Sequence, residues 1–201
     1  MQTPHPDIFA PSDPTGEGAP AEPAQKPLLM VDIDGVISLF GVPGHARPRP
    51  SSGSPGGPGP ERPEGTLHSI DGTPHFLSST AAAHLLGLAQ DFDLVWASGW
   101  EERAEEHLPR LLGLPEGLPF LRFERSPGRG HAHWKLAAID AYAGIRPLAW
   151  IDDAFNQACH DWASERPSPT LLVSTAPEEG LTSREVELLA AWAWARERSR
   201  A

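Results

Sequence analysis

The chain has 201 residues, a length typical of one domain with extensions. Its 27 acidic and 16 basic side chains give a formal net charge of −11, which argues against a dedicated duplex-binding protein because such proteins need a basic surface. The single cysteine, Cys159, excludes an internal disulfide and a cysteine-rich zinc site. No apolar run approaches the roughly 20 residues that span a bilayer, and the first residues resemble no secretory signal, so we expect a cytoplasmic protein without a membrane partner.

Two segments rich in proline and glycine interrupt the chain. Residues 1–27 contain seven prolines and almost no apolar periodicity, and we interpret them as a disordered tail. Residues 41–65 hold seven prolines and seven glycines. We expect a flexible loop there, in preference to a proline-rich ligand, because glycine interrupts most of the stretch. We therefore assign residues 28–201 to a single domain that carries this loop.

The rest of the chain alternates strand and helix patterns. It begins with a short apolar run at residues 28–33, typical of a strand buried on both faces. Asp71-Gly72 then predicts a tight hairpin between residues 67–70 and 73–77. The later elements are, in chain order, helix 78–89, strand 93–97, helices 101–112 and 133–142, strand 148–151, helix 153–165, strand 170–173 and helix 182–198. This alternation predicts an α/β fold: a Rossmann-like parallel sheet with helices on both faces and a short flap hairpin.

Polar residues gather where three of the predicted strands end. These ends carry, in chain order, Asp32 and Asp34, then Ser98, Gly99 and Trp100, then Asp152 and Asp153. We expect them to converge, because ligands of open α/β sheets bind beyond the carboxyl ends of the strands. Several carboxylates at one sheet edge repel each other unless a cation is bound, and such oxygen ligands suit Mg²⁺.

These strand ends resemble the four ordered motifs of the haloacid-dehalogenase-like (HAD) hydrolases. The motifs are Leu-Leu-Met-Val-Asp32-Ile-Asp34-Gly-Val, Ser98-Gly99, Lys135 and Trp-Ile-Asp152-Asp153, and the resemblance covers about residues 27–175. Any single motif would be weak, whereas four in the family order are specific. Within the superfamily, Val-Trp-Ala-Ser-Gly-Trp100-Glu and Gly180-Leu-Thr-Ser-Arg look like the HAD domains associated with RNA-repair proteins and their stand-alone relatives.

The resemblance implies a Mg²⁺-dependent phosphomonoester hydrolase that works through an aspartyl-phosphate. Asp32 would be the nucleophile, and Asp34 would protonate the leaving group and then activate water. Asp32, the backbone carbonyl of Asp34 and Asp152 would hold Mg²⁺. Phosphatases of the family keep an aspartate two residues after the nucleophile and dehalogenases do not, so Asp34 sets dehalogenation aside.

The resemblance also implies a phosphate-binding set. Ser98 and the backbone N–H of Gly99 would hold phosphate oxygens, and Lys135 would offset their charge. Asp153 would support the metal ligands or Lys135. Trp100 lies beside the presumed phosphate loop, where it would either wall the site or stack on a ring of the substrate.

The chain leaves little room for the inserted cap domain that covers most HAD active sites. Neither interval between the motifs is long enough for a cap core, so we expect an open site covered at most by a flap around residues 36–77. His131 and His133 are interpreted as surface histidines, since no further well-placed metal ligands accompany them.

An open site would fit large substrates or exposed phosphate groups, such as a nucleic-acid end or a phosphoprotein, as well as small esters. The charge of −11 disfavours tight nucleic-acid binding by this chain alone. The leading prediction is therefore a phosphomonoesterase. The alternatives are a nucleic-acid end-processing phosphatase and a catalytically weak binding or adaptor module.

Overall fold

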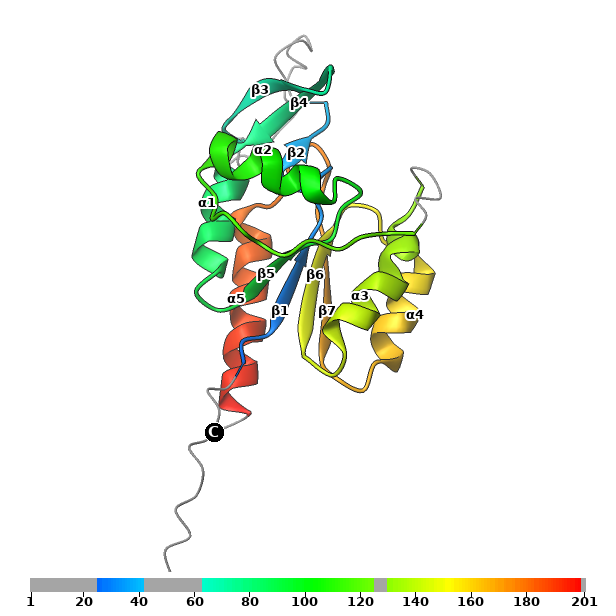
Figure 1. Cartoon of the computed structure of the whole chain (residues 1–201). Coiled ribbons are helices and arrows are strands. Elements are labelled where there is room, and N and C mark those ends of the chain that lie inside the picture. The colour runs from blue at the N-terminus through cyan, green and yellow to red at the C-terminus, as the bar shows by residue number, and fades with distance from the viewer. Residues whose placement is uncertain (1–24, 42–62, 125–129, 200–201) are drawn as a thin grey trace, which may run out of the picture.

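Two sheets make up the fold of the computed structural model, which describes residues 25–41, 63–124 and 130–199. The central sheet is parallel, with strand order β5-β1-β6-β7, and a smaller antiparallel sheet of order β2-β4-β3 stands beyond the carboxyl ends of its strands (Figure 1). The central strands are β1 (Leu28–Val31), β5 (Asp93–Trp96), β6 (Leu148–Asp152) and β7 (Thr170–Ser174).

Helices cover both faces of the central sheet, which confirms the predicted α/β class (Figure 1). One face packs against α1 (Ser79–Leu88), α2 (Glu102–Leu112) and α5 (Ser183–Arg198), and the other against α3 (Leu136–Ala143) and α4 (Gln157–Glu165). Alternation along β1 explains the two cores: Leu29 and Val31 point to the first face, and Leu28 and Met30 to the second. Both faces are apolar because both are covered.

The smaller sheet, here called the flap, contains the predicted hairpin and one unexpected strand. Its strands are β2 (Ser38–Leu39), β3 (Gly65–Ile70) and β4 (Thr73–Ser78). Asp71 (φ 50°) and Gly72 (φ 80°) supply the two positive φ angles that a tight hairpin turn requires. The two residues of β2 are too few to show an alternation in the sequence. They pair with β4 and so join the flap to the segment that follows β1.

The described segments extend into both regions predicted to lack fixed structure. Pro27 is buried, and its carbonyl accepts a hydrogen bond from the Asp93 N–H (3.0 Å), so the fixed chain begins before residue 28. Gly65, expected in the loop, is the first residue of β3. Residues 1–24 of the predicted tail and 42–62 of the predicted loop lie outside the described residues.

Two helices start differently from the prediction, and a third helix continues past an internal proline. The helix expected at 153–165 begins only at Gln157, because the Asn156 side chain caps it by accepting from the Cys159 N–H (3.3 Å). The helix expected at 133–142 starts as the 3₁₀ turn η1 (Ala132–Lys135) and continues as α3. Pro109 stays within α2, which ends three residues later where Gly113 adopts φ 68°.

No separate cap interrupts the described parts of the motif intervals. The flap and α1 occupy the interval between β1 and β5, and α2, η1 and α3 occupy the interval between β5 and β6. Within the described ranges, no helix combines the length and hydrophobicity that crossing a membrane requires.

Candidate active site

A cleft of about 660 Å³ opens between the flap and the carboxyl ends of β1, β5 and β6. The sequence-predicted site residues all line it: Asp32, Asp34, Ser98, Gly99, Trp100, Lys135, Asp152 and Asp153. The parallel sheet accounts for this convergence, since the three strand ends lie at one edge and the turn η1 delivers Lys135 beside them.

Three carboxylates and one ammonium group form the floor of the cleft. Carboxylate oxygens of Asp32, Asp152 and Asp153 lie within 4.8 Å of one another. Lys135 Nζ lies 2.9 Å from Asp32 Oδ2 and 2.7 Å from Asp152 Oδ2. Lys135, Asp32 and Asp152 are all buried. The floor therefore holds more negative than positive charge in a place that water does not screen.

The excess of negative charge on the floor contributes to raised pKa values of Asp152, Asp153 and Lys135. Burial, and then the charge of Asp32, raises the pKa of Asp152 to about 6, although Lys135 acts in the opposite direction. The same two causes raise the pKa of Asp153. Burial lowers the pKa of Lys135, but the charges of Asp32 and Asp152 raise it by more, so the pKa lies above its usual range. A second cation at this place would relieve the repulsion.

The donor set of the floor fits Mg²⁺. Its groups are carboxylate oxygens, the ligands that this hard cation prefers, and Lys135 contacts only two of the three carboxylates. Gly35 (φ 76°) lets the third acid approach, since a Cβ at this position would lie 2.4 Å from the Asp153 carboxylate. Thr175 Oγ1 holds the same turn by donating to the Gly35 carbonyl (2.8 Å). The glycine of the first motif is thus required by packing as well as by backbone conformation.

Asp34 stands apart from the three acids of the floor. Its Oδ2 accepts a hydrogen bond from Trp100 Nε1 (3.0 Å), and its Oδ1 lies 3.9 Å from His75 Nδ1. Burial raises the pKa of Asp34, the Trp100 hydrogen bond opposes this rise, and the charge of Asp32 adds to it. A carboxyl group that holds its proton more firmly than usual is suited to proton transfer.

The loop after β5 presents Ser98 and Gly99 to the cleft. Ser98 is buried, and its carbonyl accepts from the Glu101 N–H (3.0 Å), which closes a tight turn before α2. Glu101 has φ 50°, unusual for a residue with a side chain, and its carboxylate accepts from the Phe123 N–H (2.9 Å). Strained backbone of this kind often marks a functional loop.

Only one of the two roles predicted for Trp100 fits its position in the structure. Only 5% of the residue is exposed, so its ring cannot stack on a ring of the substrate. It packs edge-on against His75, with ring centroids 4.8 Å apart. Trp100 is therefore a wall of the cleft and a hydrogen-bond donor to Asp34.

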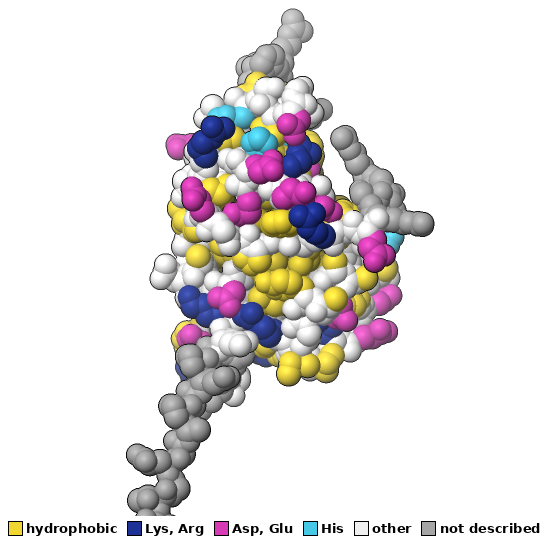
Figure 2. Space-filling model, viewed as in Figure 1, with side chains coloured by type: hydrophobic (Ala, Val, Ile, Leu, Met, Phe, Trp, Pro, Cys, Tyr) yellow, Lys and Arg dark blue, Asp and Glu magenta, His cyan; other side chains and the backbone are white. Residues whose placement is uncertain are grey.

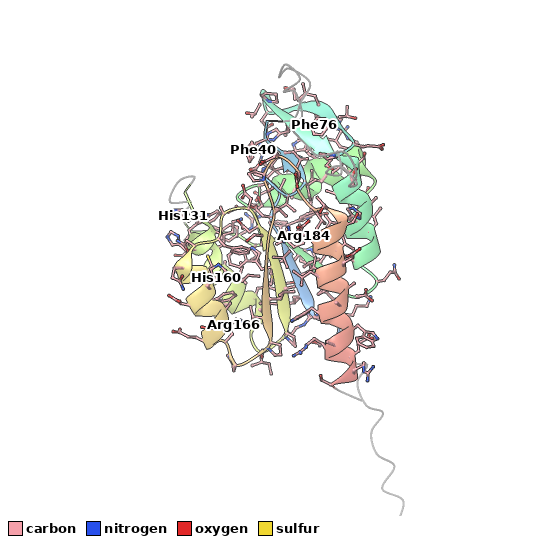
Figure 3. The ribbon with its side chains drawn as sticks, turned by 180° about the vertical axis from the view of Figure 1, so that it is seen from behind. Phe40, Phe76, His131, His160, Arg166 and Arg184 are labelled. Atoms are coloured by element: carbon pink, nitrogen blue, oxygen red, sulfur yellow. The ribbon has the colours of Figure 1, made fainter. Side chains whose placement is uncertain are left out.

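Several cleft residues were not recognised as functional from the sequence. They come mainly from the flap, from α2 and from the segment before α3: Phe40, His75, Arg103, His131 and Trp134. Figure 3 shows Phe40 on the flap side and His131 on the segment that leads to η1. His131 is exposed, as expected for a surface histidine, but it lies at the rim of the cleft. No sequence pattern marks His75, because its place depends on how the flap folds over β1.

One comparison with known proteins agrees with the fold. A family model described as the HAD domain in Swiss Army Knife RNA repair proteins matches residues 28–186, which include every predicted site residue. The comparison with curated proteins gives no match. The family supports HAD-type phosphatase or hydrolase chemistry in general. Fold, site and family match together place this chain in the HAD superfamily, in the family of HAD domains found in Swiss Army Knife RNA repair proteins.

Proposed function

We propose that the protein is a Mg²⁺-dependent phosphomonoesterase with Asp32 as its nucleophile. One observation carries the proposal: Asp32 and Asp152 meet on Lys135 at the floor, while Asp34 is held separately by Trp100. The arrangement separates the nucleophile from the proton donor. Asp32 lies beside the Lys135 cation and can attack phosphorus. Asp34, whose pKa is raised, lies away from Lys135 and can transfer protons.

Asp32, Asp152 and the backbone carbonyl of Asp34 would hold Mg²⁺, with Asp153 in support. When bound, Mg²⁺ would neutralise charge and polarise the phosphoryl group, which lets an anionic nucleophile approach an anionic ester. Ser98 Oγ and the Gly99 N–H would bind phosphoryl oxygens, and Lys135 would offset their charge.

In the first step, an oxygen of Asp32 attacks phosphorus and the bond from phosphorus to the leaving oxygen breaks. Asp34 gives its proton to that oxygen, so the product leaves as an alcohol and a phosphoryl group stays on Asp32.

In the second step, the ionised Asp34 accepts a proton from water as the water oxygen attacks phosphorus. The bond between phosphorus and Asp32 breaks, and inorganic phosphate is released. Both aspartates then have the protonation states with which they began.

A phosphorylated RNA end is a second candidate for the substrate, within the same chemistry. Membership of a family of HAD domains found in RNA repair proteins supports it, and so does a cleft without a cap in the described intervals. On the face shown in Figure 2, Lys and Arg side chains are interspersed with Asp and Glu. With a net charge of −11, we expect such RNA to be bound weakly by this chain alone.

The test measures phosphate release from an aryl phosphate, an alkyl phosphate and oligonucleotides with 5′- or 3′-phosphates, with Mg²⁺ or with a chelator. We expect turnover that requires Mg²⁺ and is lost in Asp32→Asn, a nearly isosteric change. Higher kcat/KM on one oligonucleotide than on either small ester would support the RNA-end candidate.

The matched control is Asp161→Asn, which makes the same change at an exposed residue of helix α4, where Asp161 accepts from Gln157. It should keep full activity. Turnover that survives in Asp32→Asn or in the chelator would refute the mechanism. No turnover by the wild type on any ester would favour a binding or adaptor module.

A further inference from the structure

Asp34 is held by two rings that come from different parts of the fold. Trp100, in the loop after β5, donates to Oδ2 (3.0 Å), and His75, on β4 of the flap, lies 3.9 Å from Oδ1. We propose that Trp100 and His75 are positioning residues that fix the Asp34 carboxyl group for proton transfer. The flap then contributes a residue, His75, to the active site. The inference rests on the proposed function, in which Asp34 is the general acid and base.

The two rings are fixed to each other and to the flap. Their centroids are 4.8 Å apart at an interplanar angle of 71°, and the His75 side chain is only 13% exposed. His75 Nδ1 lies 2.9 Å from Ser38 Oγ, and Ser38 pairs with Leu77 of β4. Neither ring can turn without breaking these contacts, so the orientation of Asp34 depends on the position of the flap.

The hydrogen bond from Trp100 also distinguishes the two oxygens of Asp34. An indole N–H is only a donor, so Oδ2 serves as its acceptor. Trp100 therefore fixes Oδ2 as an acceptor, and Oδ1, on the His75 side, remains the oxygen better placed to carry a proton.

Two phosphate esters separate positioning from binding. In Trp100→Phe the ring remains and the donor is lost. We compare kcat/KM, which reports the steps up to departure of the leaving group and not the later hydrolysis of the aspartyl-phosphate. We expect kcat/KM on an alkyl phosphate, whose leaving group needs a proton, to fall at least about 10-fold, part of the usual worth of a general acid. On an aryl phosphate, whose leaving group needs little protonation, kcat/KM should change less than about 3-fold.

Trp162→Phe is the matched control, because it also removes an indole hydrogen bond to a carboxylate, that of Asp140 (3.3 Å), far from the cleft. It should leave both rates unchanged. Equal losses of kcat/KM on the two esters in Trp100→Phe would overturn the positioning role and indicate a wall or binding role instead.

The contribution of the flap is tested at His75. His75→Leu should reproduce the selective loss on the alkyl ester, and His75→Asn, which keeps a polar nitrogen near the Nδ1 position, should recover part of it. Wild-type rates in His75→Leu would overturn the flap's role.

The contact itself is tested without turnover by the indole N–H resonance of Trp100, identified by its loss in Trp100→Phe. It should move upfield in Asp34→Ala, and an unmoved signal would overturn the inference. If the wild type hydrolyses neither ester, the proposed function fails and the catalytic role of the rings fails with it. The same resonance then still distinguishes a failed mechanism from a missing hydrogen bond.

Discussion

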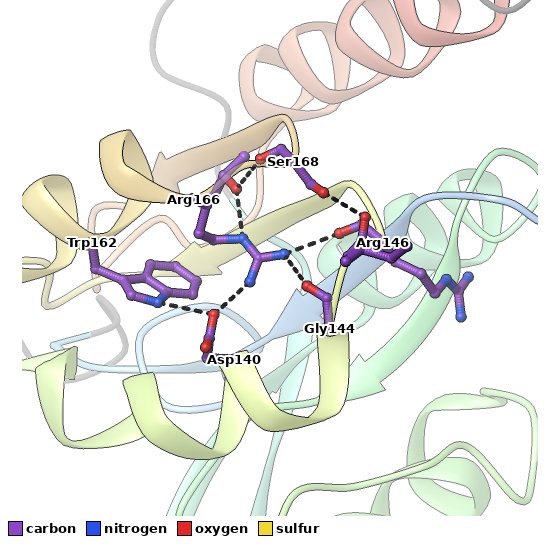
Figure 4. Close-up of polar contacts among 8 residues, drawn as sticks. Asp140, Gly144, Arg146, Trp162, Arg166 and Ser168 are labelled. Carbon is purple, nitrogen blue, oxygen red and sulfur yellow. Dashed lines mark hydrogen bonds and ion pairs between the residues drawn. The ribbon is translucent and has the colours of Figure 1, made fainter.

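Two buried cations lie at opposite ends of the central sheet and have different surroundings. Lys135 at the carboxyl end is 4% exposed, and Arg166 near the amino end of β7 is 2% exposed. Lys135 contacts two buried carboxylates, with a third close by. The acceptors of Arg166 are mostly neutral: Thr170 Oγ1 (2.9 Å) and the carbonyls of Gly144 (3.0 Å) and Arg146 (3.1 Å), together with Asp140 Oδ1 (2.7 Å) (Figure 4).

The difference is one of charge balance. The guanidinium of Arg166 meets one carboxylate, which is itself 58% exposed, so no buried charge is left unpaired. The floor around Lys135 carries excess negative charge, which raises the pKa of Asp152 and Asp153. A balanced cluster stabilises the fold, whereas an unbalanced one costs stability until it binds a ligand. Such imbalance is therefore a mark of function in this molecule.

Of the two cations, Lys135 should matter far more for activity, and Lys135→Met should have a large effect on turnover. The variant removes the cation that we propose offsets phosphate charge in a buried site, and loss of one such group costs on the order of 10²–10³-fold in kcat. The measurement is turnover of an aryl phosphate at saturating Mg²⁺. Wild-type turnover in Lys135→Met would show that the charge cluster around Lys135 does not contribute to catalysis.

Arg166→Met should lower stability and leave chemistry alone. Its hydrogen bonds involve a charged donor, and losing them should lower the free energy of unfolding by about 2–3 kcal/mol. Denaturant unfolding measures this loss, and kcat below the transition should equal that of the wild type. A fall in kcat with unchanged stability would mean that the two clusters are not separate in function.

Mg²⁺ should stabilise the protein in a pH-dependent way. Folding raises the pKa of Asp152 to about 6. Between its ordinary pKa and pH 6 the unfolded chain therefore loses a proton that the folded protein keeps. The free energy of unfolding of the metal-free protein should fall as pH rises over this range. Mg²⁺ needs the ionised form, so its stabilising effect should grow over the same range. At about 100 times its dissociation constant the gain should be about 2.7 kcal/mol above pH 7 and much smaller at pH 5.

Thermal unfolding with Mg²⁺ and with a chelator at several pH values gives this gain. In Asp152→Asn the gain should be small at every pH. An equal gain at pH 5 and pH 8 in the wild type would show that these carboxylates do not bind the metal.

The smallest effect is expected at the tip of the flap. Arg103 forms an ion pair with Asp71 (2.7 Å), but both side chains are well exposed. Asp71→Asn keeps a residue that tolerates positive φ and removes the pair, so stability should change by less than about 1 kcal/mol. Thermal unfolding measures it. A larger loss would show that this pair holds the flap in place.

The sequence was sufficient to predict the parts of the site that lie at strand ends. Asp32, Ser98 and Asp152 each follow an apolar run, and parallel strands bring such ends to one edge. The fold class follows from the same alternation of strands and helices. The family resemblance drew attention to Lys135, whose helical surroundings alone would have indicated a solvated side chain.

Contacts between distant elements were not predictable. His75 reaches Asp34 only because β2, two residues long, pairs with β4, and such a short strand has no detectable periodicity. The start of α4 was misplaced for a related reason. The sequence pattern predicts that the helix begins at Asp153. The Asp153 carboxylate packs against Gly35 instead, and the helix begins after its N-cap residue, Asn156. Periodicity reports burial along one element and carries little information about what packs across from it.

In the proposed mechanism, Asp32 becomes phosphorylated during turnover. The most direct measurement is the peptide mass spectrum of Asp34→Asn, quenched in acid during reaction with an aryl phosphate and Mg²⁺. This substrate needs little protonation to leave, and the variant lacks the base for the second step, so the intermediate should accumulate. We expect one added phosphoryl group on the peptide that contains Asp32, and none when Asp32→Asn is combined with Asp34→Asn. Phosphate release by the wild type with no phosphoryl group on that peptide in Asp34→Asn would contradict it.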